Sequence, residues 1–254
     1  MQIGLMNNPR SDLAADIDFI ASNGFDFIDL TLEYPKSHID VIDRQGILKE
    51  LKHSALEVIG HTAYYLPFGS PIDSIRVAAI NDAIRTLEFF KEAGASIVTV
   101  HPDPGVGAIE TQTTTSLNAL SFKIISDEAA KHDISIVVEN VPGVFSSVDA
   151  LNSILQSVPA LSFHLDVGHA FIHRNRFRHL LSAFKVKLRH VHLSDNRLRA
   201  DDHLPLGAGN IDWEDVVGAI KKTGYDSTFT LEVFSDDRRY VLGSRDKLKE
   251  LWQS

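Results

Sequence analysis

The chain has 254 residues, with 25 lysines and arginines against 34 aspartates and glutamates, so its formal net charge at pH 7 is −9. With 44% hydrophobic and 23% charged residues the composition is globular, and the length suits either two small domains or one α/β barrel of about 250 residues. Because the chain contains no cysteine, disulfides and thiolate metal sites are excluded, and a metal ion would need histidine, aspartate and glutamate as ligands. The acidic balance weighs against unselective binding of nucleic acid. Neither a transmembrane stretch nor a signal-peptide pattern is present, so we expect a soluble, cytoplasmic protein with no membrane partner.

Eight short runs of apolar and β-branched residues are spaced along the chain in the manner of strands. We predict strands at residues 3–5, 27–30, 56–59, 97–100, 134–138, 161–165, 189–193 and 229–233. Between the first two runs, Asp12 is placed to cap a helix that buries Leu13 and Ile17. The dipeptide Asn23-Gly24 ends this helix.

The helix after the third run has the clearest pattern, with Asp73 or Ser74 as its cap and Gly94 at its end. The residues predicted to face inward are Ile75, Ala79, Ala83, Leu87 and Phe90. Further helices are expected near residues 44–53, 113–131, 147–157, 175–185, 213–222 and 238–252.

Strict alternation of strands and helices predicts parallel strands joined by right-handed crossovers. At this length the simplest arrangement is a single α/β domain over residues 1–254, folded as a (β/α)8 TIM barrel. An open, doubly wound sheet is the rival fold.

Six predicted strands end in a side chain that can bind a metal ion. These residues are His61, His101, Glu139, Asp166, His192 and Glu232. Side chains alternate across a strand, so all six can point inward at the carboxyl-terminal mouth of a barrel, where barrel enzymes carry out their chemistry. His169 follows Asp166 by three residues, and Asp201 and His203 follow the seventh strand. Nine oxygen and nitrogen ligands suffice for one to three divalent ions, zinc or manganese.

The remaining histidines fall into two groups. His164 and His190 precede Asp166 and His192 by two residues each, so they are expected one layer below the site and in contact with its ligands. The others are expected to be exposed to solvent: His38, His53, His132, His173 and His179.

Several segments together resemble the xylose-isomerase-like TIM-barrel superfamily, also called AP endonuclease family 2, which contains sugar isomerases and epimerases as well as endonuclease IV. The matching segments are residues 61–64 (HTAY), 101–102 (HP), 139–143 (ENVPG), 166–170 (DVGHA), 191–195 (VHLSD), 201–212 (DDHLPLGAGNID) and 231–232 (LE). The similarity spans about residues 3 to 234.

Resemblance to the sugar epimerases implies one divalent ion held by Glu139, Asp166, His192 and Glu232. It also implies that the two glutamates exchange a proton with a carbon next to a carbonyl and that His169 contacts a substrate oxygen. Resemblance to endonuclease IV implies instead three zinc ions held by all nine residues, with Glu139 bridging two of them and Glu232 orienting the attacking hydroxide on a phosphodiester of abasic DNA.

Two features bear on the choice between the sugar and the DNA branch, and a third suits both. Glu33, in the loop after the second predicted strand, would repel phosphates and suits a polyhydroxy substrate. Against the sugar branch, Leu198 stands where the epimerases have a substrate-binding arginine, although Arg197 and Arg199 flank it. Tyr64 suits both branches, because it could line a sugar pocket or stack on a nucleotide.

The segment 173–199 contains eight lysines or arginines and one acid, which gives it a net charge of +7. Four of its arginines follow the sixth and seventh strands, where they could hold a sugar phosphate or a DNA backbone: Arg174, Arg176, Arg197 and Arg199.

The sequence therefore predicts a divalent-metal-dependent isomerase or epimerase of a small sugar or sugar phosphate, with Glu139, Glu232 and His169 as catalytic residues and Glu33, Tyr64, Arg197 and Arg199 as substrate contacts. The alternative is an abasic-site phosphodiesterase acting on DNA. A barrel that binds a metal or a carbohydrate without turnover is a third hypothesis, which the presence of two glutamates disfavours. A homo-oligomer is compatible with each.

Overall fold

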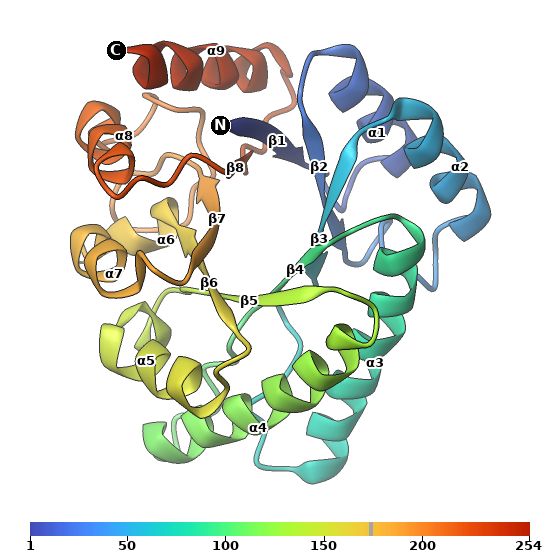
Figure 1. Cartoon of the computed structure of the whole chain (residues 1–254), viewed down its shortest axis with the longest axis vertical. Helices are drawn as coiled ribbons and strands as arrows, with labels where there is room; N and C mark the ends of the chain where they lie inside the picture. The colour runs from blue at the N-terminus through green and yellow to red at the C-terminus, as the bar shows by residue number, and fades with distance from the viewer. Residues whose placement is uncertain (173–174) are drawn as a thin grey trace.

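The computed structural model is a closed barrel of eight parallel strands with helices around it (Figure 1). It describes residues 1–172 and 175–254. The strands are β1 (Gln2–Met6), β2 (Phe27–Leu32), β3 (Glu57–Thr62), β4 (Ile97–Val100), β5 (Ser135–Glu139), β6 (Ser162–Asp166), β7 (Leu188–Leu193) and β8 (Thr228–Leu231). Each strand pairs with the next along the chain and β8 pairs with β1, so the predicted TIM barrel is confirmed and the open sheet is wrong.

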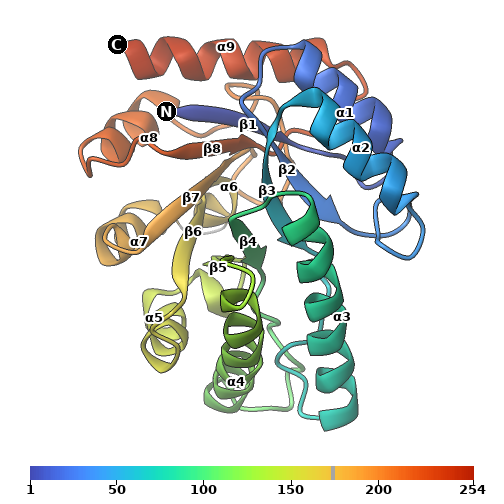
Figure 2. The same ribbon diagram turned by 45° about the vertical axis from the view of Figure 1, so that its right-hand side comes forward.

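The helices lie outside the strands, as Figure 2 shows for α1 to α5. They are α1 (Leu13–Ser22), α2 (Arg44–Ser54), α3 (Asp73–Glu92), α4 (Thr111–Ala130), α5 (Val148–Ser157), α6 (Val167–Phe171), α7 (Phe177–Phe184), α8 (Trp213–Lys221) and α9 (Arg239–Gln253), with a short 3-10 turn η1 at Val144–Ser146. All eight predicted helices are present, and α6 and η1 were not predicted from the sequence. None of the helices described is both long and apolar enough to cross a membrane.

Helix α1 begins as its sequence predicts. The Asp12 side chain accepts a hydrogen bond from the backbone N–H of Ala15, while Leu13, Ile17 and Ile20 are buried. Helix α3 differs at its first turn. Asp73 is its first helical residue and no side chain caps it, so the predicted Asp73 or Ser74 cap is wrong. Ile75, on the first turn, is 43% exposed, so the prediction that it faces inward is wrong, whereas the other four predicted inward residues are buried.

Successive side chains along each strand point alternately to the layer beneath the helices and to the inside of the barrel. In β7 and β8, Val191 and Phe229 face outward into the apolar layer beneath the helices. The next residues along, His192 and Thr230, face into the barrel and are fully buried. The same alternation continues around the mouth, so the barrel is apolar on its outer face and polar at its carboxyl-terminal inner end.

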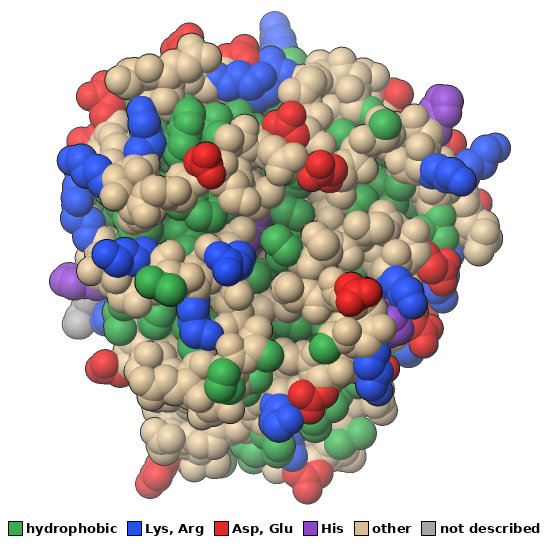
Figure 3. Space-filling view, in the orientation of Figure 1, with side chains coloured by type: hydrophobic (Ala, Val, Ile, Leu, Met, Phe, Trp, Pro, Cys, Tyr) green, Lys and Arg blue, Asp and Glu red, His purple; other side chains and the backbone are tan. Residues whose placement is uncertain are grey.

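The surface is mixed in character. In Figure 3, basic and acidic side chains are interspersed with hydrophobic ones over the visible face, as is usual for a solvated surface.

The loop between β7 and α8 is organised by Asp195, which is fully buried. Its carboxylate accepts hydrogen bonds from the backbone N–H of Gly207 at 2.7 Å, the indole N–H of Trp213 at 2.9 Å and the backbone N–H of Ile211 at 3.2 Å. The Asp195 backbone also pairs with Leu204 in an isolated β-bridge. This anchor fixes the loop that carries Asp201 and His203.

We predict that Asp195→Ala lowers the free energy of unfolding by about 3 kcal/mol, because four N–H donors, three of them buried, lose a charged acceptor at once. Denaturant unfolding measures the change. Asp226→Ala, at an exposed position, is the matched control and should stay within about 0.5 kcal/mol of the parent. Equal stability of the two variants would contradict the anchoring role.

Candidate metal centre

The structure brings all nine predicted ligands together at the carboxyl-terminal end of the barrel. His61, Glu139, Asp166 and His192 lie at or near the ends of their strands, while His101 and Glu232 follow β4 and β8 directly. His169 lies on α6, and Asp201 and His203 lie in the loop that Asp195 anchors. Six of the nine are buried; His203 and Glu232 are half-buried, Asp201 is exposed, and these three form the outer edge. The donor atoms divide into three adjoining groups.

The first group joins β3, β4 and β5. Nε2 of His61 lies 3.1 Å from Nε2 of His101, and Oε2 of Glu139 lies 3.1 Å from the His101 nitrogen and 3.6 Å from the His61 nitrogen. Ligands of a tetrahedral zinc ion with bonds of about 2.0–2.1 Å are separated by roughly 3.3 Å. The three atoms therefore have the spacing of a common ion.

The second group joins β5, β6, β7 and the residue after β8. Donor atoms of Glu139, Asp166 and His192 all lie within 4.8 Å of one another. Nδ1 of His192 also lies 3.1 Å from Oε2 of Glu232. Glu139 thus belongs to both of the first two groups.

The third group lies on the outer edge. Oδ2 of Asp201 is 2.9 Å from Nε2 of His169 and 3.1 Å from Nε2 of His203. Glu232 connects this group to the second, because its Oε1 lies 3.6 Å from Nδ1 of His203.

Unpaired oxygen atoms test whether a cation fits here. Oε2 of Glu139 and Oδ2 of Asp166 are buried, and neither has a well-aligned hydrogen bond to a residue that the structure describes, although imidazole nitrogens of His101 and His164 lie 3.1 Å and 3.2 Å from the Glu139 oxygen. A buried acceptor without a partner costs about 1–3 kcal/mol, and more when it is charged. A divalent ion would supply the missing partner, and the nitrogen and oxygen donors suit zinc or manganese.

The carboxylates of the site differ in the direction in which their pKa is shifted. Burial alone would raise the pKa of Glu139, but interactions with His101 and His164 hold it well below its usual value. The pKa of Glu232 is likewise lowered, against the effect of burial, mainly by His203. Burial raises the pKa of Asp166 to about 7, and the neighbouring carboxylates of Glu139 and Glu232 add to this rise.

Several histidines of the site have raised pKa values. Burial would lower the pKa of His169, yet contacts with Asp166, Asp201 and Glu139 raise it well above its usual value. Burial also opposes ionisation of His203, whose pKa Glu232 and Asp201 raise to about 9. Negative and positive side chains thus alternate around the site.

A further acid, Asp29, lies beneath the site and was missed by the sequence interpretation. It is 0% exposed, and three of the site's histidines surround it, namely His61, His190 and His192. Opposing the effect of burial, these histidines, led by His192, hold its pKa well below the usual value. The available signal was a single acid within the otherwise uncharged run of β2, FIDLTL.

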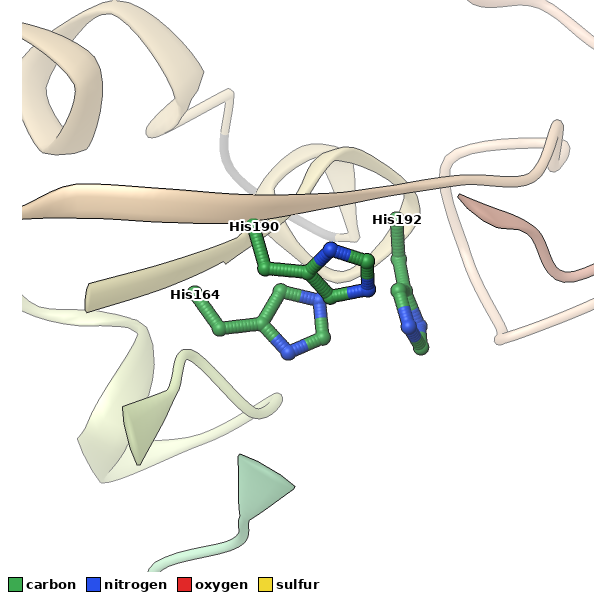
Figure 4. A group of neighbouring side chains, drawn as sticks. All are labelled: His164, His190 and His192. Atoms are coloured by element: carbon green, nitrogen blue, oxygen red, sulfur yellow. The ribbon is translucent and has the colours of Figure 1, made fainter. Parts of the chain in front are cut away.

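Histidines 164 and 190 lie one layer down, as expected from their spacing. Figure 4 shows them beside His192, reaching inward from β6 and β7. The ring centroids of His164 and His192 are 4.1 Å apart. His164 contacts Oε2 of Glu139 through Nδ1 at 3.2 Å, so both histidines touch predicted ligands or the acid beneath them.

Of the histidines expected to be exposed, His38 is buried, so that prediction is wrong for it. Tyr34 stacks on its ring at 4.4 Å between centroids, and Asp82 of α3 lies 3.3 Å from its Nε2, which explains the burial. His53 and His179 are exposed and His132 is half-buried. His173 and Arg174 lie outside the described residues.

The predicted substrate contacts lie in loops after the strands. Glu33 is buried, and its Oε1 accepts hydrogen bonds from the backbone N–H of Tyr64 and the Thr31 hydroxyl, both at 3.2 Å. The Tyr64 side chain is 66% exposed. Arg197 is exposed and lies 3.4 Å from Asp202, while Arg199 is exposed. Glu33 and Tyr64 therefore adjoin each other, and Arg197 already has an acidic partner.

We predict that Asp166→Asn stabilises the metal-free protein while weakening its binding of zinc. The folded-state pKa of Asp166 is raised, so the ionised carboxylate destabilises the fold above the unfolded pKa of 3.8, increasingly up to about pH 7. The gain from the substitution should be small near pH 4, grow towards pH 7 and then level off. Thermal unfolding with a chelator across this pH range measures it. Asp226→Asn is the exposed control, and a gain that fell with rising pH would refute the assignment.

Comparison with known proteins places the chain in a family. The family described as xylose isomerase-like TIM barrel matches residues 17–252. An uncharacterised protein of Methanocaldococcus jannaschii is 26% identical over 94% of this chain and 84% of its own length. A probable endonuclease 4 of Mycobacterium ulcerans is 24% identical over 87% of this chain and 89% of its own.

Among solved structures, a D-tagatose 3-epimerase-like protein has a TM-score of 0.89 at 22% identity, covering 100% of this chain and 97% of that one. Other structures with this fold are sugar epimerases, at 14 to 19% identity. The fold is thus one that sugar epimerases share, and the match over most of the sequence shows that the chain belongs to the xylose isomerase-like TIM barrel family.

Proposed function

We propose that the chain is a divalent-metal-dependent isomerase or epimerase, which moves a proton on a carbon next to the carbonyl of a small sugar or sugar derivative. One observation carries the proposal. Glu139 at the end of β5 and Glu232 after β8 both approach His192, from different strands. Proton transfer on both faces of a carbon needs two such carboxylates around one bound substrate.

Glu139, Asp166, His192 and Glu232 would hold the ion. When bound, a divalent ion supplies a positive charge that stabilises the negative charge developing on a substrate oxygen. The unpaired oxygens of Glu139 and Asp166 support this assignment.

The protein's own residues would hold and move the proton. The lowered pKa values of Glu139 and Glu232 leave both carboxylates ionised at neutral pH in the free protein, so that either can accept a proton from carbon and then return it. His169 is held by Asp201 at 2.9 Å and by Glu139 at 3.0 Å, and its raised pKa suits it to donate a hydrogen bond to a substrate oxygen. Glu33 and the exposed Tyr64 would contact hydroxyls and the apolar face of the sugar.

We predict that Glu139→Gln and Glu232→Gln each lower turnover of the sugar substrate by about 10²- to 10⁴-fold, because each removes a general acid-base group. The assay is a panel of ketoses and ketose phosphates in D2O, with product analysis and deuterium incorporation at carbon as readouts. Glu214→Gln, on the exposed face of α8, is the control and should keep parental activity. Full activity in both site variants would exclude the mechanism. Binding of a ketose without isotope exchange by the parent would favour a binding protein.

A second function, cleavage of a phosphodiester at an abasic site in DNA, is favoured by a different observation. Five donors beyond the epimerase set lie in the same cluster: His61, His101, His169, Asp201 and His203. Contacts of 3.1 Å and 2.9 Å within the two additional groups match the spacing of ligands around further ions. A site with three ions would suit an attack on phosphate.

Metal content separates the two functions. We expect one tightly bound zinc or manganese ion per chain for the sugar isomerase, and three for the phosphodiesterase. Elemental analysis after exhaustive dialysis gives the number, and incubation with duplex DNA containing one abasic site gives the activity. Specific incision of the DNA that His101→Ala abolishes would establish the second function in place of the first.

A further inference from the structure

Asp29 occupies a place that the proposed chemistry does not explain. It lies in the middle of β2, fully buried, one layer below the proposed ligands. Its own strand brings no basic residue to it. The groups that surround it come from β3, β7 and β8, and two of them are predicted metal ligands.

One oxygen of Asp29 makes three short contacts. Oδ2 lies 2.7 Å from Nε2 of His192 and 2.9 Å from Nε2 of His190, and it accepts a hydrogen bond from the Thr230 hydroxyl at 2.8 Å. The other oxygen, Oδ1, lies 3.4 Å from Nδ1 of His61; both atoms are buried, and neither has a well-aligned hydrogen bond to a described residue. The contacts of Oδ2 fix the orientation of the carboxylate, which directs Oδ1 at His61.

The two ligand histidines turn their other nitrogens to the site. Nδ1 of His192 lies 3.1 Å from Oε2 of Glu232, and Nε2 of His61 lies 3.1 Å from Nε2 of His101. An ionised carboxylate only accepts hydrogen bonds, so the nitrogen that faces Asp29 carries the proton in each ring. The nitrogen that faces the site is then free to bind an ion.

We infer that Asp29 is a positioning residue that selects the metal-binding nitrogen of two histidines at once, Nδ1 in His192 and Nε2 in His61. These histidines belong to two different donor groups, so a single carboxylate sets the geometry of both. A carboxylate behind a ligand histidine fixes its tautomer and ring orientation and raises its basicity as a ligand.

The neighbouring histidines contact two different acids. Of the three rings in Figure 4, His190 and His192 contact Asp29, whereas His164 contacts Glu139. His190 is held on its other side by the Thr228 hydroxyl, 2.8 Å from Nδ1. His190 and Thr230 thus hold Asp29 in place, and Asp29 in turn holds the ligands.

The inference rests on the metal-binding part of the proposed function and is independent of the substrate. It is tested on the zinc-loaded protein with ¹⁵N-labelled histidine, by two-bond ¹H–¹⁵N correlation spectra that identify the protonated nitrogen of each ring. We expect a proton on Nε2 of His192 and on Nδ1 of His61. A proton on Nδ1 of His192 or on Nε2 of His61 would overturn the inference with no variant needed.

Asp29→Asn is the decisive variant, because an amide has one acceptor oxygen and one donor nitrogen in the space of the carboxylate. It cannot accept from both rings, so we expect at least one of the two histidines to change its spectrum and zinc affinity to fall by about 10- to 100-fold. Calorimetric titration with zinc measures the affinity. Asp226→Asn, the same substitution at an exposed position, is the control and should preserve both spectra and an affinity close to that of the parent.

The outcomes separate this inference from the proposed reaction. Zinc binding with the expected protonation, but with no proton exchange on any ketose, leaves the role of Asp29 intact and removes the proposed function. Parental affinity in Asp29→Asn, or no binding of zinc by the parent, refutes the role of Asp29.

Discussion

The structure depends on how acids are buried inside the barrel. Alternation along parallel strands sends every second side chain into the apolar layer under the helices and the others into the interior. Near the mouth those inward positions hold Asp29, Glu139 and Asp166, all almost fully buried. Buried carboxylates are costly unless paired, and imidazoles from neighbouring strands provide the pairing. Oδ2 of Asp29 has two imidazoles and a hydroxyl as partners, whereas Oδ1 of Asp29, Oε2 of Glu139 and Oδ2 of Asp166 each lack a well-aligned hydrogen bond to a described residue. Two of these three incompletely paired oxygens belong to proposed metal ligands.

Much of this arrangement follows from the sequence, because a strand that ends in a charged or imidazole side chain shows its inward face directly. The alternation of strands and helices predicted the barrel, and the six strand ends identified residues that do lie together at the mouth. The strands β3, β5 and β6 end one to three residues later than predicted and so contain His61, Glu139 and Asp166 themselves, whereas β8 ends at Leu231, two residues earlier than predicted, so that Glu232 follows it. Spacing along one strand also placed His164 and His190 beneath them.

Features that depend on contacts between distant segments could not be predicted in this way. Asp29 lies 161 residues before His190 in the chain, and only closure of the barrel brings β2 to the partners it has in β7. His38 falls in a polar loop typical of exposed residues, but the ring of Tyr34 covers it. Helix α6 has five residues, too few for a periodic pattern, and it is capped by Asp166, whose side chain accepts from the His169 backbone N–H. One residue thus ends a strand, caps a helix and serves as a proposed ligand.

Charge around the mouth bears on which substrate can enter. The segment 173–199 has a net charge of +7, which considered alone would attract phosphates. Within its described part, however, Arg178 pairs with Asp215 and Arg197 with Asp202, so two of these cations are partly neutralised. In the loop after β2, Glu33 accepts a hydrogen bond from the backbone N–H of Tyr64, whose side chain is exposed. An acid next to an aromatic residue suits hydroxyl groups and disfavours a polyanion. Because the donor cluster alone is compatible with both reactions, these loops supply the argument for a small sugar over a DNA strand.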